Sequence, residues 1–133
     1  MQALNSIILE GNLVRKPDAK LTAKGTPVCN FTVASNRYFR LDGSEETKEE
    51  VSFFDVETWA KQAEICEKHL ERGRGVRVVG RLKQDRWTDK EGKNQSRIKI
   101  VAEHIEFRPR TKKQDDEPVR EAPKEERAAT ETF

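Results

Sequence analysis

Apolar and polar residues alternate along five stretches of the chain, and this period of two is typical of β-strands that rest one face on a core. The alternation predicts strands at residues 5–15, 28–37, 51–59, 76–87 and 95–107. Turn-forming residues such as Pro17-Asp18 separate them, and the second and third strands are expected to form a hairpin. The last strand holds Ile98, Ile100 and Ala102 on one face and Val101, Ile105 and Phe107 on the other. We therefore expect both of its sides to be partly covered near its end.

The spacing of apolar residues changes between the third and fourth strands. Ala63, Cys66 and Leu70 lie three and four residues apart, which predicts a helix over residues 60–72, and Gly73 stands where a C-terminal helix cap is expected. The order of elements is then strand, strand, strand, helix, strand, strand. This is the order of the OB fold, a five-stranded Greek-key barrel whose open face takes oligonucleotides. We expect an all-β OB fold with one helix between strands 3 and 4.

Two of the strands place large aromatic rings on the side that should face water. In the fourth strand Trp87 lies on the same side as Arg81 and Lys83. The first two residues of the opposite side are valines. In the third strand Phe53 and Trp59 share a side with two carboxylates. Exposed rings interleaved with cations can stack unpaired bases and hold their phosphates. The pattern predicts a surface that binds single-stranded nucleic acid.

Composition divides the chain into two parts. Of its 133 residues, 38% are charged, which is high for a globular domain. Residues 110–133 hold six Lys or Arg and seven Asp or Glu, with Val119 and Phe133 as their only large apolar residues. Such a stretch cannot build a core, so we expect a domain over residues 1–109 and a disordered charged tail over residues 110–133. The domain's net charge of +3 is mild and does not by itself identify a nucleic-acid binder.

Several classes of function find no support in the sequence. No apolar run is long enough for a signal peptide or a membrane span, so we expect a cytoplasmic, nucleoid-associated protein without membrane contact. Cys29 and Cys66 are too few for a disulfide framework and are expected to be buried. No ligand spacing indicates a metal, and no phosphate-binding loop or nucleophile elbow occurs. We expect no cofactor, no metal and no enzymatic activity.

Several segments together resemble the bacterial single-stranded DNA-binding proteins. The resemblance runs in unbroken order over residues 2–107, and the segments that carry it are NSIILEGNL (5–13), VSFF (51–54), WAK (59–61), GRLK (80–83) and RWTD (86–89). It implies an OB fold that assembles as a homotetramer and wraps single-stranded DNA without reading its sequence. It also implies a role in DNA replication, recombination and repair.

The resemblance also assigns functional positions. Its stacking positions fall on Phe39, Phe53, Trp59 and Trp87, and its cationic positions on Lys61, Arg72, Lys83 and Arg86; strand parity adds Arg81. Phe39 lies in an expected loop, where parity gives no support, and an acidic stretch follows it. Asp85 departs from the basic character that the resemblance implies beside Arg86. Phe54 falls at a position that the family uses near a subunit interface.

The tail departs from the family. The resemblance implies a tip of consecutive aspartates followed by Ile-Pro-Phe, which docks on replication and repair proteins. This chain ends in RAATETF (127–133), which keeps the terminal Phe133 but neither the acidic cluster nor the proline. Recruitment of such partners through Phe133 is therefore a hypothesis that stands beside that of a purely solvated tail.

Two other functions stay open. An OB-fold module could bind single-stranded RNA, because stacking on aromatic rings does not distinguish sugars well. The same aromatic face could instead pack against a protein, which would make the chain an interaction adaptor.

Overall fold

The computed structural model of the chain describes residues 2–109, and within that range it contains one helix and six strands. In chain order the elements are β1 (Ile7–Leu13), β2 (Asp18–Leu21), β3 (Pro27–Arg40), β4 (Thr47–Trp59), α1 (Ala60–His69), β5 (Gly75–Thr88) and β6 (Asn94–Phe107). The expected tail over residues 110–133, with Phe133, lies outside the described residues. No helix in the described part is long and apolar enough to cross a membrane.

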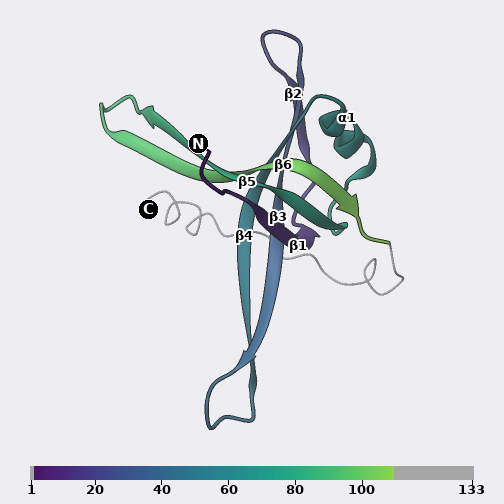
Figure 1. Cartoon of the computed structure of the whole chain (residues 1–133), viewed down its shortest axis with the longest axis vertical. Helices are drawn as coiled ribbons and strands as arrows, with labels where there is room; N and C mark the ends of the chain where they lie inside the picture. The colour runs from purple at the N-terminus through teal and green to yellow at the C-terminus, as the bar shows by residue number, and fades with distance from the viewer. Residues whose placement is uncertain (1, 110–133) are drawn as a thin grey trace.

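Five of the strands close into a barrel. β1 pairs antiparallel with β5 and, at its end, with β3, and β3 pairs antiparallel with β4. β4 runs parallel to β6 at Val56 and Ile100, and β6 returns antiparallel along β5. The ring β1-β3-β4-β6-β5, with α1 between β4 and β5 in the chain, is the OB fold (Figure 1). The expected fold is confirmed.

β2 and the end of α1 differ from the sequence expectation. β2, the four residues Asp18–Leu21, pairs with the start of β3 outside the barrel and is too short to show a readable alternation. α1 ends at His69, where the Leu70 backbone N–H donates to the Cys66 carbonyl at 2.9 Å. Gly73 is therefore not the helix cap. Its φ of +88° instead forms the turn that leads into β5.

The barrel interior is filled by the apolar side of each strand and by one face of α1. Both cysteines are buried and unpaired, as expected, and burial raises the pKa of Cys29 to about 11 and that of Cys66 to about 12. The Thr58 hydroxyl donates a hydrogen bond of 2.9 Å to the Cys29 carbonyl. The buried cluster comprises Leu9, Leu13, Cys29, Phe31, Val33, Val56, Ala63, Cys66, Leu70, Val76, Val78 and Ile100.

A bulge in β6 corrects the expected arrangement of the last strand. The pairing with β5 skips Glu103, which is therefore an extra residue on β6. This residue reverses the parity of the strand, so Ile105 packs against the same core as Ile100 instead of covering the opposite face. Gly80 lies beside the bulge, where a Cβ atom would stand 2.2 Å from the carbonyl oxygen of Val101. The two strands approach closely there because this position has no side chain.

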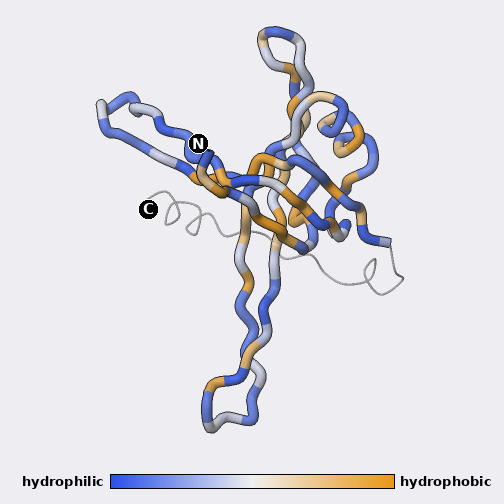
Figure 2. The backbone as a smooth tube through the Cα atoms, viewed as in Figure 1, coloured by the Kyte–Doolittle hydropathy of each residue, from blue (hydrophilic) through white to orange (hydrophobic). Residues whose placement is uncertain are grey.

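Two hairpins continue beyond the barrel, and we call them the β3–β4 arm (residues 35–52) and the β5–β6 arm (residues 82–98). The first pairs as far as Arg40–Thr47 and the second as far as Thr88–Asn94. Figure 1 shows them projecting in different directions, and Figure 2 shows that they are largely hydrophilic. β3 consequently runs through Phe39, for which the sequence predicts a loop.

Candidate nucleic-acid interface

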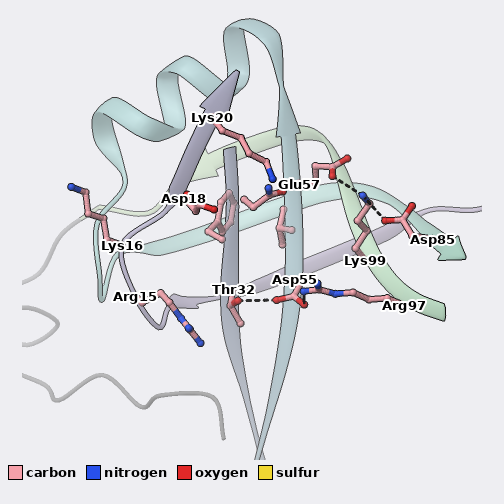
Figure 3. Close-up of a pocket in the computed structure, with 13 residues that line it drawn as sticks. Arg15, Lys16, Asp18, Lys20, Thr32, Asp55, Glu57, Asp85, Arg97 and Lys99 are labelled. Atoms are coloured by element: carbon pink, nitrogen blue, oxygen red, sulfur yellow. Dashed lines mark hydrogen bonds and ion pairs between the residues drawn. The ribbon is translucent and has the colours of Figure 1, made fainter. Parts of the chain in front are cut away.

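A polar groove of about 460 Å³ crosses the outer surface of the barrel between β2, β3, β4 and the base of the β5–β6 arm (Figure 3). On β3 and β4 the polar side chains of its wall come from alternate residues, because side chains one residue apart point to opposite faces. Asn30 lies opposite Glu57 across β3 and β4, and Thr32 lies opposite Asp55. The lining residues are Arg15, Lys16, Asp18, Lys20, Asn30, Phe31, Thr32, Asp55, Val56, Glu57, Asp85, Arg97 and Lys99.

Ion pairs occupy the end of the groove that β4, β6 and β5 form. The Lys99 Nζ atom lies 2.6 Å from Glu57 Oε2 and 2.7 Å from Asp85 Oδ2, so it bridges β4 and β5 from its own strand β6 (Figure 3). Beside it, Arg97 forms an ion pair with Asp55. Arg97 and Lys99 are therefore already neutralised by carboxylates of the same face.

The bridge around Lys99 shifts two pKa values in opposite directions. The hydrogen bond from Lys99 holds the pKa of Asp85 below its usual 3.8, against the opposing effect of burial. Burial lowers the pKa of Lys99, but hydrogen bonds to Asp85 and Glu57 outweigh that effect, and the pKa lies above its usual 10.5. Both groups are therefore charged at neutral pH.

The cations at the β2 end of the groove are not neutralised in this way. Arg15 and Lys16 lie on the connection between β1 and β2, and Lys20 lies on β2. All three are exposed, and none forms an ion pair with another residue in the range 2–109. Unpaired cations along a groove can neutralise the phosphates of an extended strand.

Trp59 stands beside the groove at the last position of β4. Trp59 points to the same side of β4 as Glu57 and is 43% exposed. Its indole N–H donates a hydrogen bond of 2.7 Å to Glu57 Oε1. The backbone turns immediately after it, because Ala60 has a φ of +57° and begins α1. The ring is thus open to solvent and fixed at a defined place.

Trp87 and Phe53 lie on the same outer side as the groove residues of their strands. Trp87, also 43% exposed, sits near the tip of the β5–β6 arm, opposite Gln95. Phe53 is half-buried on β4, two residues before Asp55 of the groove. Neither tryptophan is sealed inside the barrel, which is the condition that stacking on bases imposes.

Phe39 takes a different place. It is half-buried on the β3–β4 arm, opposite Lys48, and the guanidinium carbon of Arg37 lies 5.3 Å from its ring centre. Phe39 points to the same side of β3 as buried Phe31, whereas its neighbour Tyr38 points to the side of Asn30 and Thr32 and is 64% exposed. Tyr38 is therefore a further candidate ring, which the sequence analysis does not name.

The five predicted cationic residues are exposed, and none of them lines the groove. Lys61 is in the first turn of α1, and Arg72 is in the connection between α1 and β5. Arg81, Lys83 and Arg86 are on β5, the strand that carries the second tryptophan, with Arg86 on the side opposite to the other two. The structure thus gathers three of the five on one strand.

The five cations that line the groove are not among the residues predicted from the sequence; they are Arg15, Lys16, Lys20, Arg97 and Lys99. Arg97 and Lys99 alternate with isoleucines on β6, so the parity that singled out β5 also carries a signal for them. Arg15 and Lys20 flank or lie on β2, which the alternation does not predict. Only the pairing of β2 with β3 brings them to the groove.

The family assignment rests on nearly the whole length of the described chain. The sequence model of the Single-strand binding protein family matches residues 4–108. The chain belongs to this family. Among its curated relatives, the single-stranded DNA-binding protein of Treponema pallidum is 37% identical over 107 residues, and single-stranded DNA-binding protein 2 of Chlorobaculum tepidum is 38% identical over 120 residues. These alignments cover 80% and 88% of this chain and 59% and 80% of the relatives.

Solved structures of similar proteins have the same fold. The wild-type single-stranded DNA binding protein from Thermus aquaticus matches with a TM-score of 0.69 and 30% sequence identity, covering 80% of this chain and 50% of that one. A structure of Plasmodium falciparum SSB in complex with ssDNA matches with a TM-score of 0.74 at 24% identity, and this likeness concerns the fold alone. It covers 82% of this chain and 98% of that one. The chain spans 59% of the Treponema relative and half of the Thermus protein, and the barrel is the shared part.

Proposed function

We propose that this member of the Single-strand binding protein family binds single-stranded DNA without sequence preference and protects it during replication, recombination and repair. The observation that carries the proposal is the pair of open indoles, Trp59 beside the groove and Trp87 on the β5–β6 arm. Large rings that remain exposed beside cations have the geometry for stacking unpaired bases. The relatives are named single-stranded DNA-binding proteins, which supports the proposal.

Base stacking supplies affinity and the preference for single strands. Each base stacked on an aromatic ring contributes about 1–3 kcal/mol, and every base has a flat face, so stacking tolerates any sequence. Duplex DNA hides the faces of its bases and leaves these rings nothing to stack on. The proposed stacking residues are Phe39, Phe53, Trp59 and Trp87.

Cations hold the phosphates in this proposal. Each phosphate contacted on a single strand releases counterions, so the logarithm of the affinity falls by about 0.7 per contact for a tenfold rise in salt. Arg97 and Lys99 contribute less than unpaired cations, since carboxylates already neutralise them. The proposed phosphate contacts are Lys61, Arg72, Arg81, Lys83 and Arg86, to which the groove adds Arg15, Lys16 and Lys20.

Titration with oligo(dT), followed by tryptophan emission at two salt concentrations, tests the proposal. Stacking should quench the emission, and higher salt should weaken binding. Trp87→Ala should weaken binding by about 5- to 150-fold, which corresponds to the loss of about 1–3 kcal/mol. The matched control is Leu82→Ala, because Leu82 is an exposed apolar residue on the opposite side of β5 and should not affect affinity.

The alternative functions predict different outcomes of the same titration. Unchanged emission and no binding would overturn the proposal and favour an interaction adaptor, in which the aromatic face packs against a protein. Competition between oligo(dT) and oligo(U) decides between DNA and RNA. Stronger binding of oligo(U) would indicate an RNA-binding module instead.

The proposal describes a binding protein and not an enzyme, acting in the cytoplasm at the nucleoid without a cofactor. Members of the family are binding proteins. No three His, Cys, Asp or Glu side chains of residues 2–109 are grouped so as to hold a metal ion. Burial and raised pKa values also keep the thiols of Cys29 and Cys66 from acting as nucleophiles. An oligonucleotide incubated with the protein should therefore be recovered at full length.

We further propose that the chain assembles as a homotetramer. Apolar side chains that stay open on a single chain support this, namely Ile8 on β1 and Phe54 on β4. Light scattering coupled to size-exclusion chromatography should give about four times the chain mass of 15.4 kDa. The mass of one chain would overturn this part of the proposal.

The boundary between residues 1–109 as the binding domain and residues 110–133 as a charged tail is likewise proposed. Recruitment of replication and repair proteins through Phe133, which lies outside the described residues, is supported by its aromatic ring. Deleting residues 130–133 should abolish co-purification of such partners and leave oligo(dT) binding unchanged. Unchanged co-purification would discard the idea.

A further inference from the structure

A chain of polar contacts runs through the groove to a ring that is proposed to stack. The indole N–H of Trp59 donates to Glu57 Oε1 at 2.7 Å, and the other oxygen of that carboxylate, Oε2, accepts from Lys99 Nζ at 2.6 Å. Lys99 Nζ also lies 2.7 Å from Asp85 Oδ2. Figure 3 shows the contacts of Lys99 with Glu57 and with Asp85. Glu57 on β4 therefore contacts the indole directly, and Lys99 on β6 and Asp85 on β5 are connected to it through Glu57.

Glu57 is an unexpected residue on a face that should attract phosphates. Its side chain is 11% exposed, and a carboxylate there both loses hydration and repels an anion. Lys99 does not depend on it for neutralisation, because Asp85 already offers a carboxylate. What Glu57 adds is an acceptor for the indole N–H of Trp59.

An anchored ring suits stacking. A side chain that is already held in its bound orientation loses less conformational entropy when a base stacks on it. The backbone end of Trp59 is defined by the turn at Ala60, and its indole end by Glu57. Lys99 in turn holds the Glu57 carboxylate through its second oxygen.

We propose that Glu57 is the positioning residue for Trp59: its carboxylate fixes the indole in an open orientation for a nucleobase, and Lys99 fixes the carboxylate. The consequence for binding rests on the proposed function, because Glu57 prepares the ring and touches no base itself. The hold of Glu57 on the ring can be measured without DNA.

Two substitutions of similar size separate the hydrogen bond from the charge. Glu57→Gln keeps an oxygen that accepts from the indole and removes the negative charge, whereas Glu57→Met removes both. Because the two variants lose the same charge, a difference between them reports the acceptor. Glu103→Gln, at the exposed bulge of β6, is the matched control for one lost negative charge.

The first readout needs no DNA. The chain has two tryptophans, so in a Trp87→Phe background all tryptophan emission comes from Trp59. The anisotropy of this emission and the exchange rate of the indole N–H measure how firmly the ring is held. We expect Glu57→Gln to resemble its parent and Glu57→Met to show lower anisotropy and faster exchange. Equal values for the two variants would overturn the positioning role.

The second readout is the affinity for oligo(dT). We expect Glu57→Met to bind about two- to tenfold more weakly than Glu57→Gln, the range for one hydrogen bond. Trp59→Phe keeps a ring but has no N–H to donate, so in that background the two substitutions of Glu57 should bind equally. A difference that persists there would reflect a general structural effect of methionine and would overturn the proposal.

The two readouts separate failure of this inference from failure of the proposed function. If the wild-type chain does not bind oligo(dT), the proposed function fails, and the comparison without DNA still decides whether Glu57 holds the ring. If the wild type binds but the Glu57→Gln and Glu57→Met variants bind equally, the positioning role fails and the proposed function stands.

Discussion

Two isoleucines of β6 that lie two positions apart show how the barrel differs from its arms. Ile100 belongs to the barrel and is 1% exposed, whereas Ile98 points to the same side of the strand from the β5–β6 arm and is 47% exposed. Around Ile100 the strands close into a ring, but the arm is a two-stranded ribbon (Figure 1). Alternation along a strand therefore indicates a buried side only where a further layer covers it.

The same difference bears on how the proposed stacking rings are held. Trp59 lies where the barrel wall meets α1 and has a hydrogen-bond partner beside the groove. Trp87 lies near the tip of an arm, where few buried contacts restrain the ribbon. We infer that the barrel presents a pre-positioned ring and that the arm extends the reach of the surface.

The largest effect should come from a methyl group added at Gly80, where the barrel strands β5 and β6 approach closely. A Cβ atom at Gly80 would stand 2.2 Å from the carbonyl oxygen of Val101, and the backbone must move apart to relieve this clash. We expect Gly80→Ala to lower the free energy of unfolding by about 4 kcal/mol or more, as measured by urea denaturation.

The matched substitution in the arm is Gly92→Ala. A Cβ atom at this tip meets nothing within 4 Å, and only the φ of +82° opposes it. The expected loss is about 1 kcal/mol, the usual penalty for a side chain in the left-handed region. Equal losses for Gly80→Ala and Gly92→Ala would contradict the distinction between closed barrel and open arm.

The two isoleucines test the same distinction by removing volume. Ile100→Ala leaves a cavity in the core and should lower the free energy of unfolding by about 3 kcal/mol. Ile98→Ala should change it by no more than about 0.5 kcal/mol, because its side chain is largely in solvent. A loss above about 2 kcal/mol for Ile98→Ala would show that the arm is covered in solution. Repeating the denaturation at several protein concentrations would then reveal whether a second copy covers it.

The barrel could be predicted because local pattern and global fold agree there. Its five strands and the helix follow from alternation and from the change of period between Trp59 and Gly75. β2 could not be predicted, because four residues show no period and the strand exists through its pairing with β3. The bulge at Glu103 is likewise a property of two strands together, and it reverses a parity that the sequence of one strand leaves undetermined.

The candidate site divides in the same way. Trp59 and Trp87 stand out from the sequence because their size conflicts with the polar side on which parity places them. The partners of Lys99 do not stand out from the sequence. Glu57 and Asp85 lie on other strands, and only the pairing of the strands in the barrel brings them to Lys99. The exposed rings can be predicted from the alternation within one strand, whereas the ion pairs of the groove depend on the pairing of strands that are distant in sequence.

A smaller effect of opposite sign is expected where the barrel wall turns into α1. Ala60 has a φ of +57°, whereas the arm tips use Gly43 and Gly92 at similar left-handed angles. Alanine costs about 1–2 kcal/mol in this region, and glycine loses about 0.5–1 kcal/mol in chain entropy. Ala60→Gly should therefore stabilise the fold by about 0.5–1 kcal/mol, seen as a higher midpoint of thermal unfolding.

Ala63→Gly, one turn further along α1, is the matched control. Ala63 is buried inside the helix, and glycine there should destabilise the fold by about 1 kcal/mol or more. If both substitutions destabilise the protein, the backbone at Ala60 stores no strain.

The smallest effect concerns the ion pair that ties the base of the β5–β6 arm to the groove. The hydrogen bond from Lys99 holds the pKa of Asp85 below 3.8, so the ionised carboxylate stabilises the fold. This contribution is fully present above pH 3.8 and is lost as the pH falls through the lowered pKa. The Asp85 side chain is 37% exposed, so solvent screens the pair and its effect should be smaller than the three preceding ones.

Asp85→Asn should therefore lower the free energy of unfolding more at about pH 7 than at about pH 2.5, as measured by urea denaturation at both values. Asp42→Asn, in the loop at the tip of the β3–β4 arm, removes the same charge from a residue that has no ion-pair partner in the described part of the chain. It should leave the pH dependence of stability as it is in the wild type. A loss for Asp85→Asn that is as large in acid as at neutral pH would mean that this side chain contributes by packing, because a contribution from its ionised form must shrink as the pH falls below 3.8.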